Sequence, residues 1–159
     1  MNKRFMLTAA GMAATGIAGS ASAYLVDFTH ELDRWAGEHA WHVYSSGGSV
    51  VASMYHNSVS SLMYAGANSL SYVASTNSDI FGTITGTLDL AAGTYNVQMQ
   101  DTYGDGWAWG SFVGGLAIGS GSASMPSGSG ASFDFSVVPA PGALALLGLA
   151  GLAGTRRRK

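Results

Sequence analysis

The loop DTYGDGW, residues 101–107, holds the side chains whose types and spacing are best suited to bind a metal ion. Asp101 and Asp105 lie four residues apart, and glycines at positions 104 and 106 allow the backbone between them to turn tightly. Carboxylate oxygens that converge in this way are the ligands that Ca²⁺ prefers. The twelfth residue counted from Asp101 is Phe112 and not the Glu of an EF-hand, so a complete site needs another Asp or Glu from elsewhere. In the alternative interpretation, the aspartates only accept hydrogen bonds from backbone N–H groups of the turn.

Aromatic side chains gather in and directly after the same loop. Trp107 and Trp109 would project to one side of a strand, close to Tyr103. Such rings can stack on a sugar, which makes carbohydrate binding the sharper hypothesis, and the alternative is that the pair packs within the protein.

The remaining residues give little support to catalysis. The sequence has no Cys, and no serine stands in a G-x-S-x-G motif. The four histidines are interpreted as surface or hydrogen-bonded groups. Thr83, Thr85 and Thr87 form a short row of the kind that binds ice, but three threonines make too small a surface and are also good strand residues. We therefore expect a protein that is not an enzyme.

The charge of the chain is divided between its middle and its ends. Residues 24–138 contain all nine acidic residues and a single basic residue, Arg34, so this part has a formal charge of −8. Nucleic acids bind basic surfaces, and a nucleic-acid partner is therefore excluded. The acidic middle suits an extracellular environment or a divalent cation.

Alternating apolar and polar residues, separated by glycine-containing turns, predict an antiparallel β-sandwich. We also expect a short helix over residues 27–36 and a flexible Ser/Gly-rich connection over residues 119–130. An N-terminal signal helix and a C-terminal transmembrane helix would flank the sandwich. The predicted strands span residues 41–45, 50–55, 58–64, 70–74, 80–90, 95–100, 107–113, 116–118 and 131–137.

Residues 1–23 have the pattern of a secretory signal peptide. Lys3 and Arg4 precede an apolar segment, and Ala21 and Ala23 form the small-x-small cleavage site. Residues 24–137 would then be the extracytoplasmic domain.

Residues 138–159 have the pattern of a sorting and anchoring tail. A proline-containing turn comes first, then an apolar run over residues 142–154, then a basic end that favours the cytoplasmic side of a membrane. The run is short for a membrane span, so a buried core helix is the alternative. The residues of the motif are Val138, Pro139, Ala140, Pro141, Arg156, Arg157, Arg158 and Lys159.

This tail resembles the PEP-CTERM sorting signal of Gram-negative bacteria, with Ala140 at the position where that family usually has Glu. The same kind of tail is also labelled the C-terminal region of ice-binding proteins. The resemblance implies processing by an exosortase, a transient stay in the inner membrane, and an association with biofilm and extracellular polysaccharide.

Residues 93–107 resemble a second motif, G-x-Y-x-[VL]-x-[ML]-x-D-[ST]-[YW]-G-D-G-W, of secreted bacterial β-domains. Those domains often have an earlier E-x-x-W segment and a G-x-V-V segment, which residues 38–41 and 48–51 match. The resemblance implies an extracellular β-sandwich without a firmly known activity.

The sequence as a whole therefore predicts an exported cell-surface or matrix protein that reaches the periplasmic side of the inner membrane and then the cell surface. The main alternative is a Ca²⁺-supported carbohydrate-binding module, and a weaker alternative is an ice-binding protein.

Overall fold

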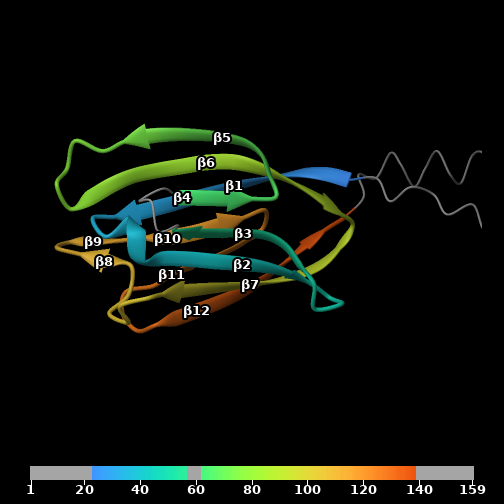
Figure 1. Ribbon diagram of the computed structural model, residues 1–159. Coiled ribbons are helices and arrows are strands. Elements are labelled where there is room, and N and C mark those ends of the chain that lie inside the picture. The colour runs from blue at the N-terminus through green and yellow to red at the C-terminus, as the bar shows by residue number, and fades with distance from the viewer. Residues whose placement is uncertain (1–22, 57–61, 139–159) are drawn as a thin grey trace, which may run out of the picture.

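The computed structural model describes residues 23–56 and 62–138, which Figure 1 draws as coloured ribbon. These residues form antiparallel β-strands and one short 3₁₀ turn, so the prediction of an all-β antiparallel fold is confirmed. Among them, no helix has the length and apolar character that a membrane crossing requires. Apart from Ala23 and Val138, the predicted signal peptide and sorting tail lie outside the described residues.

The strands are arranged in two five-stranded sheets and a small two-stranded ribbon. The first sheet has the order β11-β10-β1-β6-β5, and the second has the order β12-β7-β2-β3-β4. Strands β8 and β9 pair with each other. The elements are β1 (Ala23–Asp33), η1 (Ala36–Glu38), β2 (His39–Ser45), β3 (Val50–His56), β4 (Leu62–Ala65), β5 (Ala67–Ala74), β6 (Ile80–Ala91), β7 (Gly93–Asp101), β8 (Ala108–Trp109), β9 (Phe112–Val113), β10 (Gly115–Ile118), β11 (Gly121–Ser124) and β12 (Gly130–Val137).

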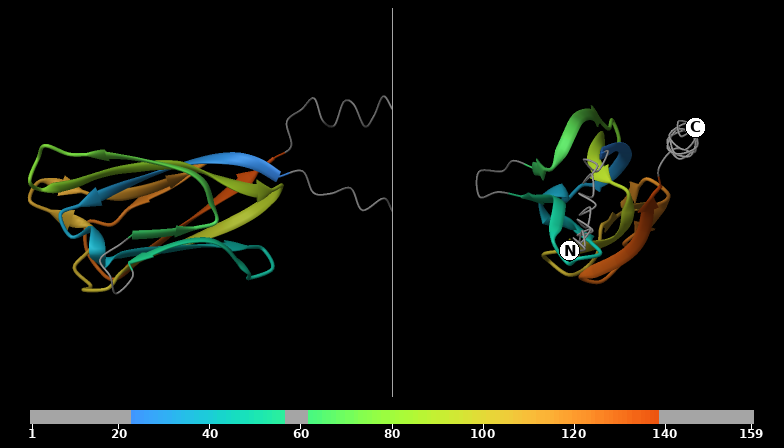
Figure 2. Two further views of the ribbon diagram at one scale, coloured as in Figure 1. Left: turned by 45° about the horizontal axis from the view of Figure 1, so that its top comes forward. Right: turned by 90° about the vertical axis from the view of Figure 1, so that its right-hand side faces the viewer.

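The inward faces of the two sheets share one hydrophobic core. On β7, Tyr95, Val97 and Met99 are buried and alternate with more exposed residues, as the sequence pattern predicts. Phe28 of the first sheet meets Trp41 of the second edge to face, with ring centroids 5.8 Å apart. The end-on view in Figure 2 shows the sheets as two layers. Burial of these alternating side chains is the main force that holds the layers together.

The prediction of a short helix over residues 27–36 is wrong. Residues up to Asp33 belong to β1, the central strand of the first sheet, which pairs with both β6 and β10. Val26, Phe28, His30 and Leu32 are buried in strict alternation, which is the period of a strand. The helical spacing of apolar residues in this segment was incidental, because pairing with distant strands and burial of one face decide the conformation.

The prediction of a flexible connection over residues 119–130 is also wrong. Within this segment, β11 pairs with β10 over four residues, and Met125 is fully buried. A Cβ added at Gly121 would lie 2.6 Å from the carbonyl oxygen of Asp134 in β12, so the absence of a side chain allows the two strands to approach closely. Serine and glycine therefore serve here as small strand residues at the side where the two sheets meet.

The chain enters and leaves the fold at one end. Ala23 is paired with Ala91 and Val137 with Gly93, so the first and last strands of the described domain begin and end beside the turn between β6 and β7. The opposite end contains η1, the 101–107 loop and the β8–β9 ribbon (Figure 1). The residues of the candidate site therefore lie at the end of the fold that is remote from Ala23 and Val137.

Candidate cation and ligand site

The 101–107 loop is held by one carboxylate oxygen of Asp101. This oxygen, Oδ1, accepts hydrogen bonds from the backbone N–H groups of Tyr103 at 2.8 Å and Gly104 at 2.6 Å. Gly104 and Gly106 have φ values of 95° and 101°, which residues with a side chain rarely adopt. A turn-forming role for Asp101 is therefore observed, and it uses only one of the two oxygens.

Glu38 supplies the third carboxylate that the sequence analysis required but did not name. Carboxylate oxygens of Glu38, Asp101 and Asp105 all lie within 4.8 Å of one another. The backbone fixes this arrangement, because His39 pairs with Asp101 between β2 and β7, and Thr102 N–H donates to the Glu38 carbonyl oxygen at 3.0 Å. Glu38 belongs to the E-x-x-W segment, and that match was the only signal in the sequence that pointed to it.

The second oxygen of Asp101 is buried. Oδ2 has no hydrogen-bond partner among the described residues, although only 5% of the Asp101 surface is exposed. A buried carboxylate oxygen without a partner is costly, and this cost falls when a cation binds it. Because Asp101 belongs to the cluster of three carboxylates, a cation held by the cluster would satisfy this oxygen.

The negative charges of the cluster affect one another. The pKa of Glu38 is raised by partial burial and by the neighbouring carboxylates Asp101, Asp105 and Asp33. Like charges this close disfavour ionisation, whereas a divalent cation between them would favour it. The cluster is thus arranged in a way that a bound cation would stabilise.

A cleft of about 450 Å³ adjoins the cluster and is lined by aromatic side chains and carboxylates. The rings of Trp35 and Trp109 meet edge to face, with centroids 5.7 Å apart and an interplanar angle of 83°. Tyr103 is 78% exposed, and the two tryptophans are 47% and 41% exposed. The residues that line the cleft are Trp35, Glu38, Tyr103, Asp105 and Trp109.

Trp107 does not belong to this cleft, and its predicted role in ligand stacking is wrong. The side chain is fully buried, and its ring lies parallel to that of His39, with centroids 4.1 Å apart and an interplanar angle of 6°. Its Nε1–H donates to the Gln100 carbonyl oxygen at 3.1 Å. Trp107 therefore packs under the loop, whereas Tyr103 and Trp109 lie in the cleft as the ligand hypothesis requires.

A chain of buried polar side chains lies beneath the site, and the sequence analysis missed it. The Asp33 carboxylate can only accept, so His39 Nε2–H donates to it at 3.1 Å, and His39 Nδ1 must accept from His30 Nε2–H at 3.1 Å. His30 Nδ1 then accepts from the Tyr64 hydroxyl at 2.8 Å. Burial, followed by the proximity of His39, lowers the pKa of His30 well below its usual value. Burial also lowers the pKa of His39, although the hydrogen bond to Asp33 and the charges of Asp33 and Asp101 oppose this shift. Each histidine is hydrogen-bonded through both ring nitrogens.

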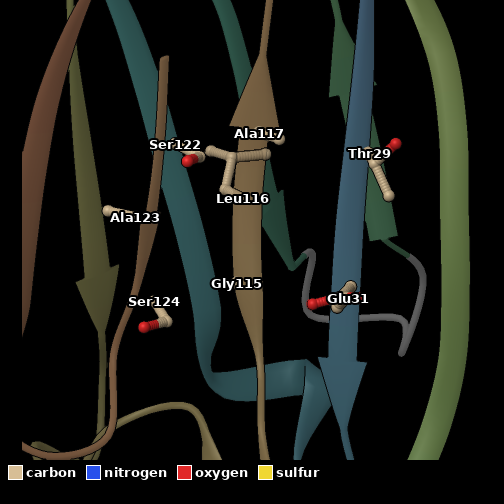
Figure 3. Close-up of a pocket in the computed structure, with 8 residues that line it drawn as sticks. All are labelled: Thr29, Glu31, Gly115, Leu116, Ala117, Ser122, Ala123 and Ser124. Carbon is tan, nitrogen blue, oxygen red and sulfur yellow. The ribbon is translucent and has the colours of Figure 1, made fainter. Parts of the chain in front are cut away.

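A second depression lies on the outer face of the first sheet, over β1, β10 and β11 (Figure 3). Glu31 is the one ionisable side chain among the described residues that line it. Since neither a second charged group nor an aromatic ring lies there, this depression has no arrangement that could coordinate a metal ion or stack a ligand. Its other lining residues are Thr29, Gly115, Leu116, Ala117, Ser122, Ala123 and Ser124.

Comparison with known proteins gives no match. No family model matches this sequence, and neither a curated protein nor a solved structure is significantly similar to it.

Proposed function

We propose that this chain is an exported β-sandwich protein of the bacterial cell surface or extracellular matrix, with a binding role and no catalytic one. The signal-peptide pattern of residues 1–23 and the PEP-CTERM-like tail of residues 138–159 support export and sorting. The fold is compatible with this proposal, because Ala23 and Val137, at the two ends of the described domain, lie opposite the candidate site. A domain held through its tail would therefore present the site away from the membrane.

We further propose that the domain binds Ca²⁺ through Glu38, Asp101 and Asp105. The observation that carries this proposal is the convergence of three carboxylates, one of which has a buried oxygen without a partner among the described residues. The ligand set consists of oxygens, which suits Ca²⁺ better than Zn²⁺. His39 lies next to the cluster in the sequence, but both of its ring nitrogens are occupied in the buried chain. Ca²⁺ also accepts irregular coordination more readily than Mg²⁺ does.

The calcium proposal is tested by unfolding the full chain with urea in a polyoxyethylene detergent, with Ca²⁺ or with EGTA. Binding to the folded state alone would raise the free energy of unfolding by about 2.7 kcal/mol at a Ca²⁺ concentration 100 times the Kd. Asp105→Asn removes the charge of one of the three carboxylates and should therefore lose most of this gain. Asp105 is exposed, so this substitution should leave the turn intact. Asp89→Asn, at an exposed position of β6, is the control and should keep the gain. An equal free energy of unfolding with Ca²⁺ and with EGTA would refute calcium binding.

The sorting proposal is tested by fractionation of the native cells. We expect the full-length chain in the inner membrane as a precursor and a shorter form at the cell surface. A chain that ends at residue 138 should be released into the periplasm without passing through the membrane-bound stage. Recovery of the full-length polypeptide from the cytosol in soluble form would contradict both export and sorting.

A further inference from the structure

We infer that the aromatic cleft binds a neutral glycan whose adjacent hydroxyl groups complete the coordination of the Ca²⁺ ion held by Glu38, Asp101 and Asp105. This inference rests on the calcium site proposed above and names the class of ligand that this site would take. It uses Trp35, Tyr103 and Trp109 as the walls that hold the sugar ring.

Three carboxylates leave the ion incompletely coordinated. Ca²⁺ takes six to eight oxygen ligands. Asp101 can offer mainly Oδ2, because Oδ1 already accepts two backbone N–H groups. Glu38 and Asp105 line both the carboxylate cluster and the cleft, so the cleft opens directly onto the proposed ion. Oxygens from a ligand in the cleft can therefore fill the remaining positions.

The walls of the cleft are aromatic. Three aromatic side chains, each at least 41% exposed, gather at one place although exposure of large apolar rings to water is unfavourable. A sugar ring has an apolar face of C–H groups and an edge of hydroxyl groups. The face suits an aromatic ring, and the edge suits carboxylates and a cation. This combination of rings and oxygen ligands at one cleft is the one that a glycan requires.

A glycan suits this cleft better than an organic cation does, although aromatic rings with nearby carboxylates also attract cations. Arg34 already lies against these rings, with its guanidinium carbon 5.8 Å from the centroids of Trp35 and of Trp109. The protein thus supplies its own cation to the two tryptophans. A second cation would be repelled by Arg34 and by the Ca²⁺ ion.

The charge of the chain favours a neutral glycan over an acidic one. Residues 24–138 have a formal charge of −8, and Arg34 is the single basic residue among them. A polyanionic glycan would be repelled by this field as it approached, more strongly at low salt than at high salt. The hydroxyl groups of a neutral sugar bind the ion without that penalty.

The test measures retention of the full chain, in a polyoxyethylene detergent that contains no sugar, on immobilised mannan, dextran and polygalacturonate. We expect retention on at least one of the two neutral polymers with millimolar Ca²⁺ and elution by EGTA. Trp109→Ala should weaken binding by about 2- to 10-fold, as expected for loss of one aromatic contact. Trp109→Phe should restore most of it. Tyr72→Ala, which removes an exposed ring of β5 outside the cleft, is the matched control and should bind like the wild type.

A parallel measurement separates this inference from the calcium proposal. Tb³⁺ in place of Ca²⁺ should luminesce on excitation of the aromatic residues, because Tyr103 and Trp109 line a cleft that Glu38 and Asp105 also line. Tb³⁺ luminescence without retention on either neutral polymer would overturn the glycan inference and leave the calcium site standing. Loss of both signals would overturn both proposals. Retention that persists in EGTA, retention on polygalacturonate alone, or binding of tetramethylammonium in EGTA would each overturn the glycan inference.

Discussion

The buried histidine chain predicts that the domain loses stability in mild acid. His30 is completely buried, and the packing around it lowers its pKa well below the usual value of about 6.5. In the unfolded chain, His30 regains that usual value and takes up a proton as the pH falls below it. The unfolded state then binds more protons than the folded state, so the free energy of unfolding decreases with falling pH. The contribution of His30 is complete above pH 6.5 and is lost progressively below it.

The size of this effect follows from proton linkage. One proton bound only by the unfolded state changes the free energy of unfolding by about 1.4 kcal/mol for each pH unit. In His30→Gln, the amide can still donate to His39 but cannot titrate. Disruption of the buried chain should cost this variant about 1–3 kcal/mol at pH 7.5. Below pH 6.5, however, its stability should fall less steeply than that of the wild type, by about 1.4 kcal/mol per pH unit.

The assay is urea unfolding of the full chain at half-unit steps from pH 7.5 to 5.0, in EGTA so that calcium binding does not contribute. Titrating groups that do not contact His30, such as Glu38, contribute to both curves, so the difference between the curves reports His30 together with its hydrogen-bonded neighbour His39. At a slope difference of up to about 1.4 kcal/mol per unit, the initial deficit of about 2 kcal/mol should shrink as the pH falls below 6.5. His56→Gln, at an exposed position of β3, is the control for the loss of one histidine. Parallel curves for His30→Gln and the wild type would refute the reasoning.

Three further substitutions test the packing, each by the shift of the urea midpoint at pH 7.5. Gly106→Ala should destabilise the domain by at least about 1 kcal/mol, because φ is 101° and the new Cβ would lie 2.6 Å from the backbone of Ser127. An unchanged urea midpoint would contradict this loop conformation. Gly86→Ala should cost about 1–3 kcal/mol, because the Cβ would collide with the β5 backbone, and wild-type stability would argue against the β5–β6 pairing. Tyr95→Phe should cost about 1 kcal/mol through loss of the 2.8 Å hydrogen bond to the Ala91 carbonyl oxygen, and no loss would show that water replaces this bond.

The sequence predicts those strands well whose pattern is local. On β7, alternation of large apolar and amide side chains identifies both the strand and its inward face. Strands were predicted over residues 41–45 and 50–55 on either side of a glycine-containing turn; β2 and β3 pair there, and Gly48 has a φ of 80°. In both cases the residues that decide the structure are neighbours in the chain.

Where distant residues decide the structure, the sequence alone was insufficient. A hydrophobic residue at position 30 would have made the apolar alternation of β1 obvious. Because His30 stands there, part of this strand was interpreted as a helix. Its partners, His39 and Tyr64, come from the other sheet. The candidate site shows the same limit. Asp101 and Asp105 were visible as a motif in the sequence. Glu38 and Trp35 join them only through the pairing of β2 with β7 and the turn of η1.

The buried chain and the candidate site are not independent features. The Asp33 oxygen that accepts from His39 also accepts from the Trp35 backbone N–H at 2.8 Å. It therefore ties the start of η1, which carries one wall of the cleft, to the buried histidines. At the other end of η1, the Glu38 carbonyl oxygen binds the Thr102 N–H and joins η1 to the loop of the two aspartates. A binding site built from short loops needs such anchors, because each loop alone has too little buried surface to fix its side chains. The buried Asp33 thus anchors Trp35, and the backbone hydrogen bond from Thr102 anchors Glu38 beside the loop of Asp101 and Asp105.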